Sequence, residues 1–226
     1  MSELLRAVRL AKTWDAGGPA PIRAVVDASL NIESGETIVV TGPSGSGKTT
    51  LLSMLGALLR PDRGEMWLDG VDIASAPESV RQATRLKKIG FVFQRGLLLE
   101  HFSARQNVAL VLYAAGTPKA EALKTSEELL ERLGLGGRGD HYPAALSPGE
   151  RQRVAVARAV ALQPRVVFAD EPTAHLDSAS GAQVVRELWA LATGAGAGLV
   201  VVTHDPRVTE IADRVLRLED GYLFSA

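Results

Sequence analysis

The chain of 226 residues is long enough for one well-filled core, and its charged (23%) and hydrophobic (46%) fractions are ordinary for a folded soluble domain. A formal net charge of −1 gives no reason to expect nucleic acid or an anionic membrane surface as a partner. There is no cysteine, which excludes disulfides, thiolate catalysis and cysteine-bound zinc and suits the cytosol.

We expect neither a signal peptide nor a membrane-spanning segment in this sequence. Residues 1–12 lack the apolar run of a signal peptide. The longest uncharged stretch, residues 188–203, contains three glycines, whereas a spanning helix needs roughly 20 mostly apolar residues. Any role at a membrane is therefore expected to depend on a partner protein.

The N-terminal part of the chain is predicted to form β-structure. Apolar residues alternate with mostly polar ones over residues 24–32, a pattern typical of a strand with one buried face. A loop rich in glycine and proline, residues 17–21, precedes this strand. Trp14 stands just ahead of the loop, and its spacing alone indicates an ordinary core or surface aromatic residue. A short buried strand is expected at residues 37–41.

The nine residues after this strand fit the phosphate-binding loop G-x-x-x-x-G-K-[S/T] in full. Glycines let several backbone N–H groups point inward, and the following helix directs its positive end at the same place. We expect Lys48 to reach the β- and γ-phosphates of a nucleotide and the Thr49 hydroxyl to bind Mg²⁺. A helix predicted over residues 50–59, ended by Pro61, follows the loop. The loop residues are Gly42, Pro43, Ser44, Gly45, Ser46, Gly47, Lys48, Thr49 and Thr50.

The middle of the chain is predicted to be mainly helical. A helix is expected at residues 77–88, followed by a buried strand at 89–93 that ends at Gln94. Two more helices are expected at residues 103–113 and 119–133, the first capped by a serine. Together with the helix described next, they form a helical insert of about residues 95–163.

The last helix of this insert has a well-defined start. Ser147 is the expected N-cap, and Pro148 takes the first helical position, where its missing N–H has no partner to lose. Glu150 stands three residues after Ser147, which completes a capping box. The helix is expected to run to about Leu162.

The C-terminal part alternates strands with a helix again. Short apolar strands are expected at residues 166–169 and 199–202, with a helix at 178–192 between them. Two last strands flank Asp220-Gly221, a strong hairpin signal. Strands that alternate with helices around a phosphate loop indicate a mostly parallel α/β sheet.

Two carboxylates follow the strand at residues 166–169. Asp170 is placed to hold Mg²⁺ through water, as the second acidic element of such NTPases does. Glu171 can face the γ-phosphate and polarise an attacking water. The phosphate loop alone does not separate kinases, GTPases, motors and transport ATPases, and this acid pair narrows the choice.

Five further stretches, in the right order, make the sequence resemble the nucleotide-binding subunit of an ATP-binding cassette (ABC) transporter. Trp14 aligns with that family's adenine-stacking aromatic residue, which replaces the first interpretation of Trp14. The resemblance covers nearly the whole chain, and residues 91–94 and 107–110 are similar to the macrolide-exporter and lipoprotein-release group. The five stretches are the Q-loop (Phe93-Gln94), the signature motif (Leu146 to Arg153), the Walker B segment (Ala169 to Thr173), the D-loop (Ala174 to Asp177) and the switch histidine (Thr203-His204-Asp205).

The resemblance implies an α/β P-loop NTPase of the ABC type. Residues 1–226 would form a single domain with a mostly parallel sheet core, an N-terminal antiparallel β subdomain and the helical insert. Two copies would enclose two ATP molecules, each between the Lys48 loop of one copy and Ser147 and Gly149 of the other. A separate transmembrane permease subunit would hold the chain at the cytoplasmic face of the membrane.

The resemblance also assigns roles to residues. Glu171 would be the general base, and His204 would contact the γ-phosphate and hold the site closed. Gln94 would sense Mg²⁺ and relay closure to the helical insert. The implied Mg²⁺ residues are Thr49, Gln94 and Asp170, and the implied ATP-binding residues outside the phosphate loop are Trp14, Gln94, Ser147, Gly149 and Asp177.

Two other interpretations remain open from the sequence. A soluble or regulatory ABC ATPase could act as an ATP-gated switch without transport, and a phosphotransferase would leave the signature motif and His204 without a purpose. The family signature usually reads Leu-Ser-Gly-Gly, so Pro148 departs from it, and His175 stands where the D-loop has a small residue or asparagine. Both departures bear on the efficiency of hydrolysis.

Overall fold

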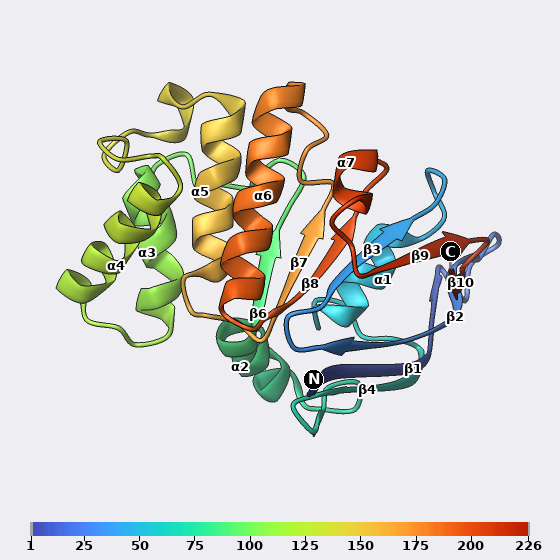
Figure 1. Ribbon diagram of the computed structural model, residues 1–226. Coiled ribbons are helices and arrows are strands. Elements are labelled where there is room, and N and C mark those ends of the chain that lie inside the picture. Colours follow the sequence, from blue (N-terminus) through green and yellow to red (C-terminus); the bar gives the residue numbers. More distant parts are fainter. Residues whose placement is uncertain (1, 226) are drawn as a thin grey trace.

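The computed structural model describes residues 2–225, whose strands form one sheet of ten. Their order across the sheet is β5-β4-β1-β2-β10-β9-β3-β8-β7-β6 (Figure 1). The strands are β1 (Glu3–Trp14), β2 (Ile22–Glu33), β3 (Thr37–Thr41), β4 (Arg63–Leu68), β5 (Val71–Asp72), β6 (Ile89–Val92), β7 (Val166–Asp170), β8 (Gly198–Val202), β9 (Arg214–Glu219) and β10 (Tyr222–Ser225).

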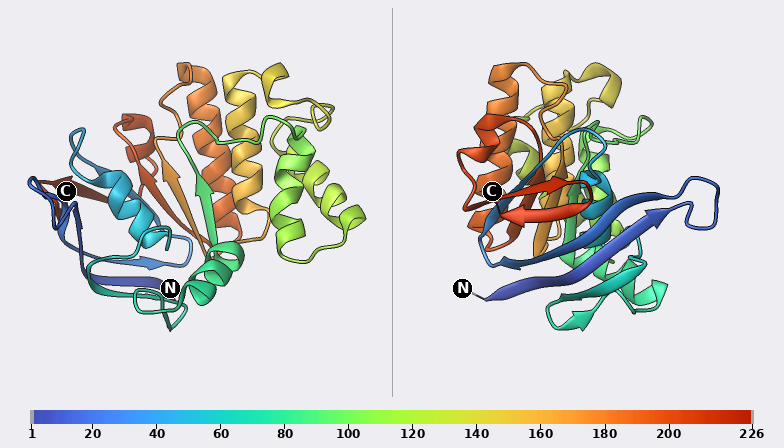
Figure 2. Two further views of the ribbon diagram at one scale, coloured as in Figure 1. Left: turned by 180° about the vertical axis from the view of Figure 1, so that it is seen from behind. Right: turned by 90° about the vertical axis from the view of Figure 1, so that its right-hand side faces the viewer.

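Helices cover both faces of this sheet. In Figure 2, α5 and α6 lie on one face of the strands β6, β7 and β8, with α3 and α4 beside α5, whereas α1 lies on the opposite face, next to β1 and β2. The helices are α1 (Lys48–Leu55), α2 (Glu78–Lys88), α3 (Ala104–Ala114), α4 (Lys119–Arg132), α5 (Pro148–Val160), α6 (Ser178–Gly194) and α7 (Pro206–Thr209), with a 3₁₀ turn at Pro143–Ala145.

The sheet has a parallel part and an antiparallel part. The strands β9, β3, β8, β7 and β6 pair in parallel. The strands β1, β2, β4 and β5 pair antiparallel, and β10 joins the two parts. The predicted α/β fold, with a mostly parallel core and an N-terminal antiparallel part, is confirmed.

Strand β7 shows why the parallel strands are continuous apolar runs in the sequence. Val166 and Phe168 pack into the core around α1, whereas Val167 and Ala169 pack into the core under α3 to α6. Because successive side chains of a strand point to opposite faces, a strand covered on both faces needs apolar residues throughout. The strand therefore places Asp170 and Glu171 at the carboxyl end of the parallel strands.

Helix α1 ends at Leu55, four residues before the predicted end. Gly56 follows, and a Cβ there would lie 1.9 Å from the Phe91 ring, so a larger residue would have to displace this ring. The next residue, Ala57, has a left-handed φ of 57°, and its carbonyl accepts hydrogen bonds from Arg81 and Arg85. Contacts from α2 therefore end α1 before Pro61 is reached.

The local signals in the sequence are otherwise reproduced. Asp220 (φ 49°) and Gly221 (φ 80°) form the turn between β9 and β10, as expected for an Asp-Gly hairpin. Ser103 and Ser147 each cap a helix through a complete capping box. The short elements β5 and α7 were not expected, because two to four residues carry too little periodicity to be recognised.

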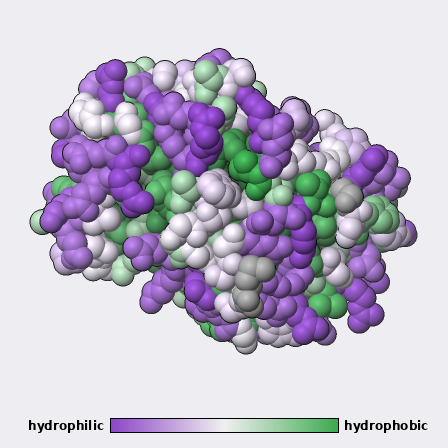
Figure 3. All heavy atoms as spheres, viewed as in Figure 1, coloured by the Kyte–Doolittle hydropathy of each residue, from purple (hydrophilic) through white to green (hydrophobic). Residues whose placement is uncertain are grey.

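The exposed surface is largely hydrophilic on the face shown in Figure 3, where hydrophobic side chains occur in scattered small groups. Within the part of the chain that the structure describes, no helix has both the length and the apolar character needed to cross a membrane.

Candidate nucleotide-binding site

The loop between β3 and α1 has a backbone that only glycine can supply at two positions. Gly42 has φ 148° and Gly47 has φ 98°, both in the region that disfavours other residues. A Cβ on Gly42 would lie 2.1 Å from the Leu218 carbonyl oxygen, and one on Gly47 would lie 1.9 Å from that of Ala24. The loop is thus seated between β2 and β9.

The Lys48 side chain folds back over this loop. Its Nζ donates hydrogen bonds to the carbonyl oxygens of Gly42 and Pro43, both at 2.8 Å. Lys48 is also the first residue of α1, whose first N–H groups point toward the loop. The ammonium group and the helix end therefore act on the same anion site.

Asp170 lies at the carboxyl end of β7, beside the start of α1. The Thr49 hydroxyl donates a hydrogen bond to its carboxylate at 3.0 Å. Burial raises the pKa of Asp170 above its ordinary value, and the hydrogen bond from Thr49 opposes this shift in part. A cation bound near this carboxylate would offset the cost of burying its charge.

The residues present fit a magnesium ion that arrives with a nucleotide. Among residues 2–225 there is no cluster of three or more His, Asp or Glu side chains that could enclose a metal. Mg²⁺ commonly binds through one or two carboxylates together with substrate phosphates, so an all-protein cage is not needed. Thr49 and Asp170 supply a hydroxyl and a carboxylate beside the phosphate loop.

Glu171 has an unusual backbone conformation and lies next to His204, which follows strand β8. Its φ is 45°, and its N–H donates to the carbonyl oxygen of Val202 at 2.8 Å. One carboxylate oxygen lies 2.9 Å from Nδ1 of His204, and the other accepts from the Thr203 hydroxyl at 3.3 Å. His204 was expected to contact a γ-phosphate, and here its ring faces Glu171.

A cleft of about 530 Å³ joins these groups, although they come from distant parts of the sequence. It brings the acid pair, His204, Gln94 and Trp14 together at the phosphate loop. Gly42, Pro43 and Ser46 belong to the same loop without lining the cleft. The lining residues are Trp14, Ile22, Ala24, Ser44, Gly45, Gly47, Lys48, Thr49, Thr50, Gln94, Asp170, Glu171, Val202 and His204.

Trp14 forms one wall of the cleft, with 45% of its surface exposed. Its indole Nε1 donates to the Thr50 hydroxyl at 3.4 Å, and Nζ of Lys12 lies 5.7 Å from the ring centroid. Lys12 in turn pairs with Asp62. These contacts hold an exposed aromatic face at the cleft, where a planar base could stack.

Three predicted residues lie outside this cleft. Ser147 is the N-cap of α5, and its hydroxyl accepts from the Glu150 N–H at 3.2 Å. Gly149 packs on α6, where an added Cβ would come within 3.2 Å of Cβ of Ser180. Asp177 caps α6 by accepting from the N–H groups of the second and third helical residues. Within this single chain, none of the three reaches the phosphate loop.

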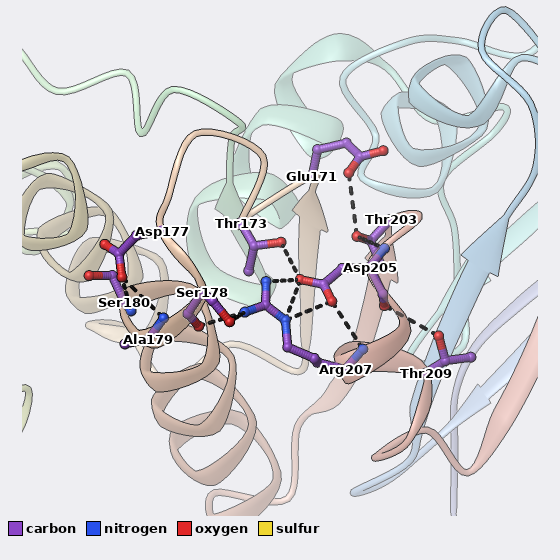
Figure 4. Close-up of polar contacts among 10 residues, drawn as sticks. All are labelled: Glu171, Thr173, Asp177, Ser178, Ala179, Ser180, Thr203, Asp205, Arg207 and Thr209. Carbon is purple, nitrogen blue, oxygen red and sulfur yellow. Dashed lines mark hydrogen bonds and ion pairs between the residues drawn. The ribbon is translucent and has the colours of Figure 1, made fainter.

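The sequence did not identify five residues of the site and its surroundings, one of which is Val202 at the end of β8. Ile22 and Ala24 line the cleft, and Ile22 pairs with Trp14 across strands β1 and β2. Only the strand register could have found them, because nothing in their own spacing marks them. Thr173 and Arg207 contact Asp205 next to the switch histidine (Figure 4).

A mostly parallel α/β core with a phosphate loop and an acid pair at a strand end defines a P-loop nucleoside triphosphatase. Within that class, the family model described as ABC transporter matches residues 25–174. The chain belongs to the ABC transporter family.

Relatives place the chain close to the two groups that its motifs indicated. A lipoprotein-releasing system ATP-binding protein from a Shewanella species is 40% identical over 223 residues, covering 99% of this chain and 96% of that protein. The macrolide export ATP-binding/permease protein of Rhodospirillum rubrum is 44% identical over 218 residues, covering 96% of this chain. This chain spans only 33% of that second, longer protein.

Solved structures confirm the fold. The dimeric structure of MJ0796, described as a bacterial ABC transporter cassette, matches with a TM-score of 0.90 and 36% identity, covering 97% of this chain and 96% of the other. A second structure of the same cassette, described as a post-hydrolysis state bound to ADP and Pi, matches with the same values.

Proposed function

We propose that this chain is the ATP-binding and ATP-hydrolysing subunit of an ABC transporter and works as a pair of copies around two ATP molecules. The observation that carries the proposal is a division of the site. The phosphate loop, acid pair and His204 share one cleft, whereas Ser147 and Gly149, at a helix start suited to an anion, lie outside it. A second copy supplies the missing half.

The residues of the cleft have separate roles in ATP binding and hydrolysis. Lys48 exchanges its two loop carbonyls for the phosphates of ATP, and Trp14 stacks on the base. Thr49, Asp170 and Gln94 hold Mg²⁺, which when bound neutralises phosphate charge. Glu171 accepts the proton of the attacking water, and His204, 2.9 Å from it, fixes the carboxylate and reaches toward the γ-phosphate.

The signature residues act across the pair. Ser147 and the N–H of Gly149 bind the γ-phosphate of the ATP held by the other copy, and Asp177 lies at the same interface. MJ0796, which is 36% identical to this chain, is described as dimeric and as binding ADP and Pi. In this chain ATP would thus hold two copies together, and its hydrolysis would release them.

A separate transmembrane permease is the proposed partner. The matched relatives are named as a lipoprotein-releasing system ATP-binding protein and as a macrolide export ATP-binding/permease protein. In the second, an ATP-binding part and a permease share one name, and this chain matches a third of it. The helical subdomain, residues 95–163 of a single domain, would contact the permease and hold the chain at the cytoplasmic face of the membrane.

ATP-dependent pairing tests the proposal directly. Glu171→Gln keeps the shape of the side chain but removes the base, so hydrolysis should slow by ~10²–10⁴ while ATP binding persists. With ATP and Mg²⁺, light scattering should then report twice the monomer mass of 24.0 kDa, and without nucleotide it should report the monomer. Lys48→Ala is the matched control and should stay monomeric with ATP. A tight dimer without nucleotide, or normal turnover in Glu171→Gln, contradicts the proposal.

The permease is tested by a separate experiment. The tagged Glu171→Gln variant, loaded with ATP, is used as bait for detergent-solubilised membranes of the source cells. Recovery of an integral membrane protein that raises the ATPase rate of the wild-type chain supports the partner. A chain that pairs with ATP but finds no such protein would be an ATP-gated switch without transport.

A further inference from the structure

A cluster of charged and hydroxyl side chains joins the switch histidine segment to the start of α6 (Figure 4). The Asp205 carboxylate lies at its centre. It accepts hydrogen bonds from Nε of Arg207 at 2.8 Å, from the Arg207 backbone N–H at 3.0 Å and from the Thr173 hydroxyl at 3.0 Å. Asp205, the residue directly after His204, is therefore hydrogen-bonded to the loop that follows Glu171.

Arg207 extends this cluster to another element. Its Nη1 donates to the hydroxyl of Ser178 at 3.1 Å and also to the Ser178 carbonyl oxygen. Ser178 is the first residue of α6 and follows Asp177, the cap of that helix. The guanidinium also lies against the first turn of α6, since a Cβ on Gly181 would come within 3.1 Å of Nη2.

The pair at the centre of the cluster is charged at neutral pH. The guanidinium of Arg207 lowers the pKa of Asp205, and Asp205 raises the pKa of Arg207. Only 10% of the Asp205 side chain is exposed, compared with 35% of Arg207, so water competes weakly for the carboxylate. Charge-assisted hydrogen bonds of this kind hold geometry better than contacts between neutral groups.

The same segment holds the proposed catalytic pair. The Asp205 N–H donates to the Thr203 hydroxyl at 3.0 Å, and that hydroxyl donates to Glu171 at 3.3 Å. His204 lies between these two residues, 2.9 Å from the other oxygen of Glu171. A shift of Asp205 would therefore move the backbone that follows His204 and the Thr203 hydroxyl that orients Glu171.

We propose that Arg207 is a positioning residue for ATP hydrolysis: by bridging Asp205 and Ser178, it makes the His204 segment and the Asp177 turn move as one body. The inference rests on the proposed function, because it assigns to Arg207 the alignment of Glu171 and His204. Within residues 2–225, Arg207 neither lines the cleft nor forms a hydrogen bond with a residue that does, so it acts on turnover and leaves Trp14 and the phosphate loop in place.

An arginine is required for this bridge. Its planar fork donates to the carboxylate through Nε and Nη2 while Nη1 reaches Ser178. A lysine ammonium is a single point charge and cannot occupy both places at once. Arg207→Lys should therefore keep the ion pair with Asp205 and lose the link to α6.

The test compares Arg207→Gln with Arg214→Gln in the full chain. Arg214 is a matched control because its side chain is similarly exposed (38%) and contacts Glu36, in the turn between β2 and β3, and Asn31 of β2, neither of which lines the cleft. ATPase rates give kcat and KM for ATP, a fluorescent ATP analogue reports binding, and thermal unfolding reports stability.

In Arg207→Gln, kcat should fall at least about tenfold, the loss expected for one charge-assisted bridge, with KM and analogue binding within about twofold of wild type. Arg214→Gln should keep wild-type kcat at a similar unfolding midpoint. Arg207→Lys should lie between Arg207→Gln and wild type. Wild-type kcat in Arg207→Gln, an equal loss in Arg214→Gln, or a loss explained by weaker ATP binding overturns the inference.

Two outcomes separate this inference from the function on which it rests. If the wild-type chain binds and hydrolyses no ATP, the proposed function fails first. If Arg207→Gln does not fold, Arg207→Lys decides: a kcat reduced about threefold or more at unchanged KM supports the bridge, and wild-type kcat overturns it.

Discussion

Replacing Pro148 by glycine tests how the unusual start of α5 affects turnover. Pro148 occupies the first helical position, directly after the Ser147 cap. Proline has no N–H, so the helix end that is proposed to bind a γ-phosphate has one donor fewer than it would have with glycine. Pro148→Gly restores this donor and also loosens the start of the helix.

Pro148→Gly has two opposing effects, an added N–H donor for the phosphate and a less restricted helix start. A hydrogen bond to a charged group contributes roughly 1.5–3 kcal/mol, so a restored donor could accelerate the reaction by ~10–100-fold. However, the first helical position has no intrahelical acceptor in any case, and the Arg151 N–H already starts the helix by donating to the Ser147 carbonyl at 2.9 Å. The N–H of Gly149 finds no acceptor among residues 2–225 and stays available to a phosphate.

Glycine also carries a cost at this position. Its flexibility in the unfolded chain lowers stability by about 0.4–1 kcal/mol relative to proline where proline's φ already fits. The Ser147 cap, with the reciprocal bond from its N–H to Glu150 at 2.8 Å, still holds the helix start. We therefore expect Pro148→Gly to change ATPase turnover by less than about tenfold, or ~1.4 kcal/mol in the barrier.

Steady-state phosphate release, with the permease present, measures this effect. Gly149→Asp serves as the inactive reference, because it places a carboxylate against the γ-phosphate and crowds Ser180 on α6. A hundredfold rise in the turnover of Pro148→Gly would refute the reasoning. The natural helix start would then be impaired, and the chain would act as a slow ATP-gated switch.

Two further predictions concern the phosphate loop and the Asp205 pair. Gly47→Ala should destabilise the protein by more than ~1 kcal/mol and abolish ATP binding, because its Cβ would meet the Ala24 carbonyl oxygen at 1.9 Å. Gly45→Ala has a similarly positive φ of 82° but no atom within 4 Å, so thermal unfolding should show a smaller loss, and equal losses would exclude the steric cause. Asp205→Asn should lower the unfolding midpoint at pH 7. This difference from wild type should shrink as the pH falls below the ordinary carboxyl pKa of 3.8, since the lowered pKa of Asp205 makes its stabilisation full above that value and lost below it. A difference that grows in acid would contradict this assignment.

The sequence by itself determined the features that depend on neighbouring residues. The phosphate loop, the N-cap of Ser103, the capping box of Ser147 and the Asp220-Gly221 hairpin all rest on contacts or dihedral angles within a few residues. Such contacts need little chain to be ordered, so short patterns specify them. The apolar runs that alternate with helices likewise indicated a mostly parallel α/β sheet, and the motif order indicated the family.

Only the tertiary structure decided which distant groups share a site. The end of α1 is set by Arg81 and Arg85, whose bonds to the Ala57 carbonyl no local pattern records. Ile22 lines the cleft because the register of β1 and β2 places it opposite Trp14. The link from Arg207 to Ser178 exists because the segment that follows β8 lies beside the start of α6. Long-range contacts depend on how the whole chain packs, so the types of the two residues in contact do not predict them.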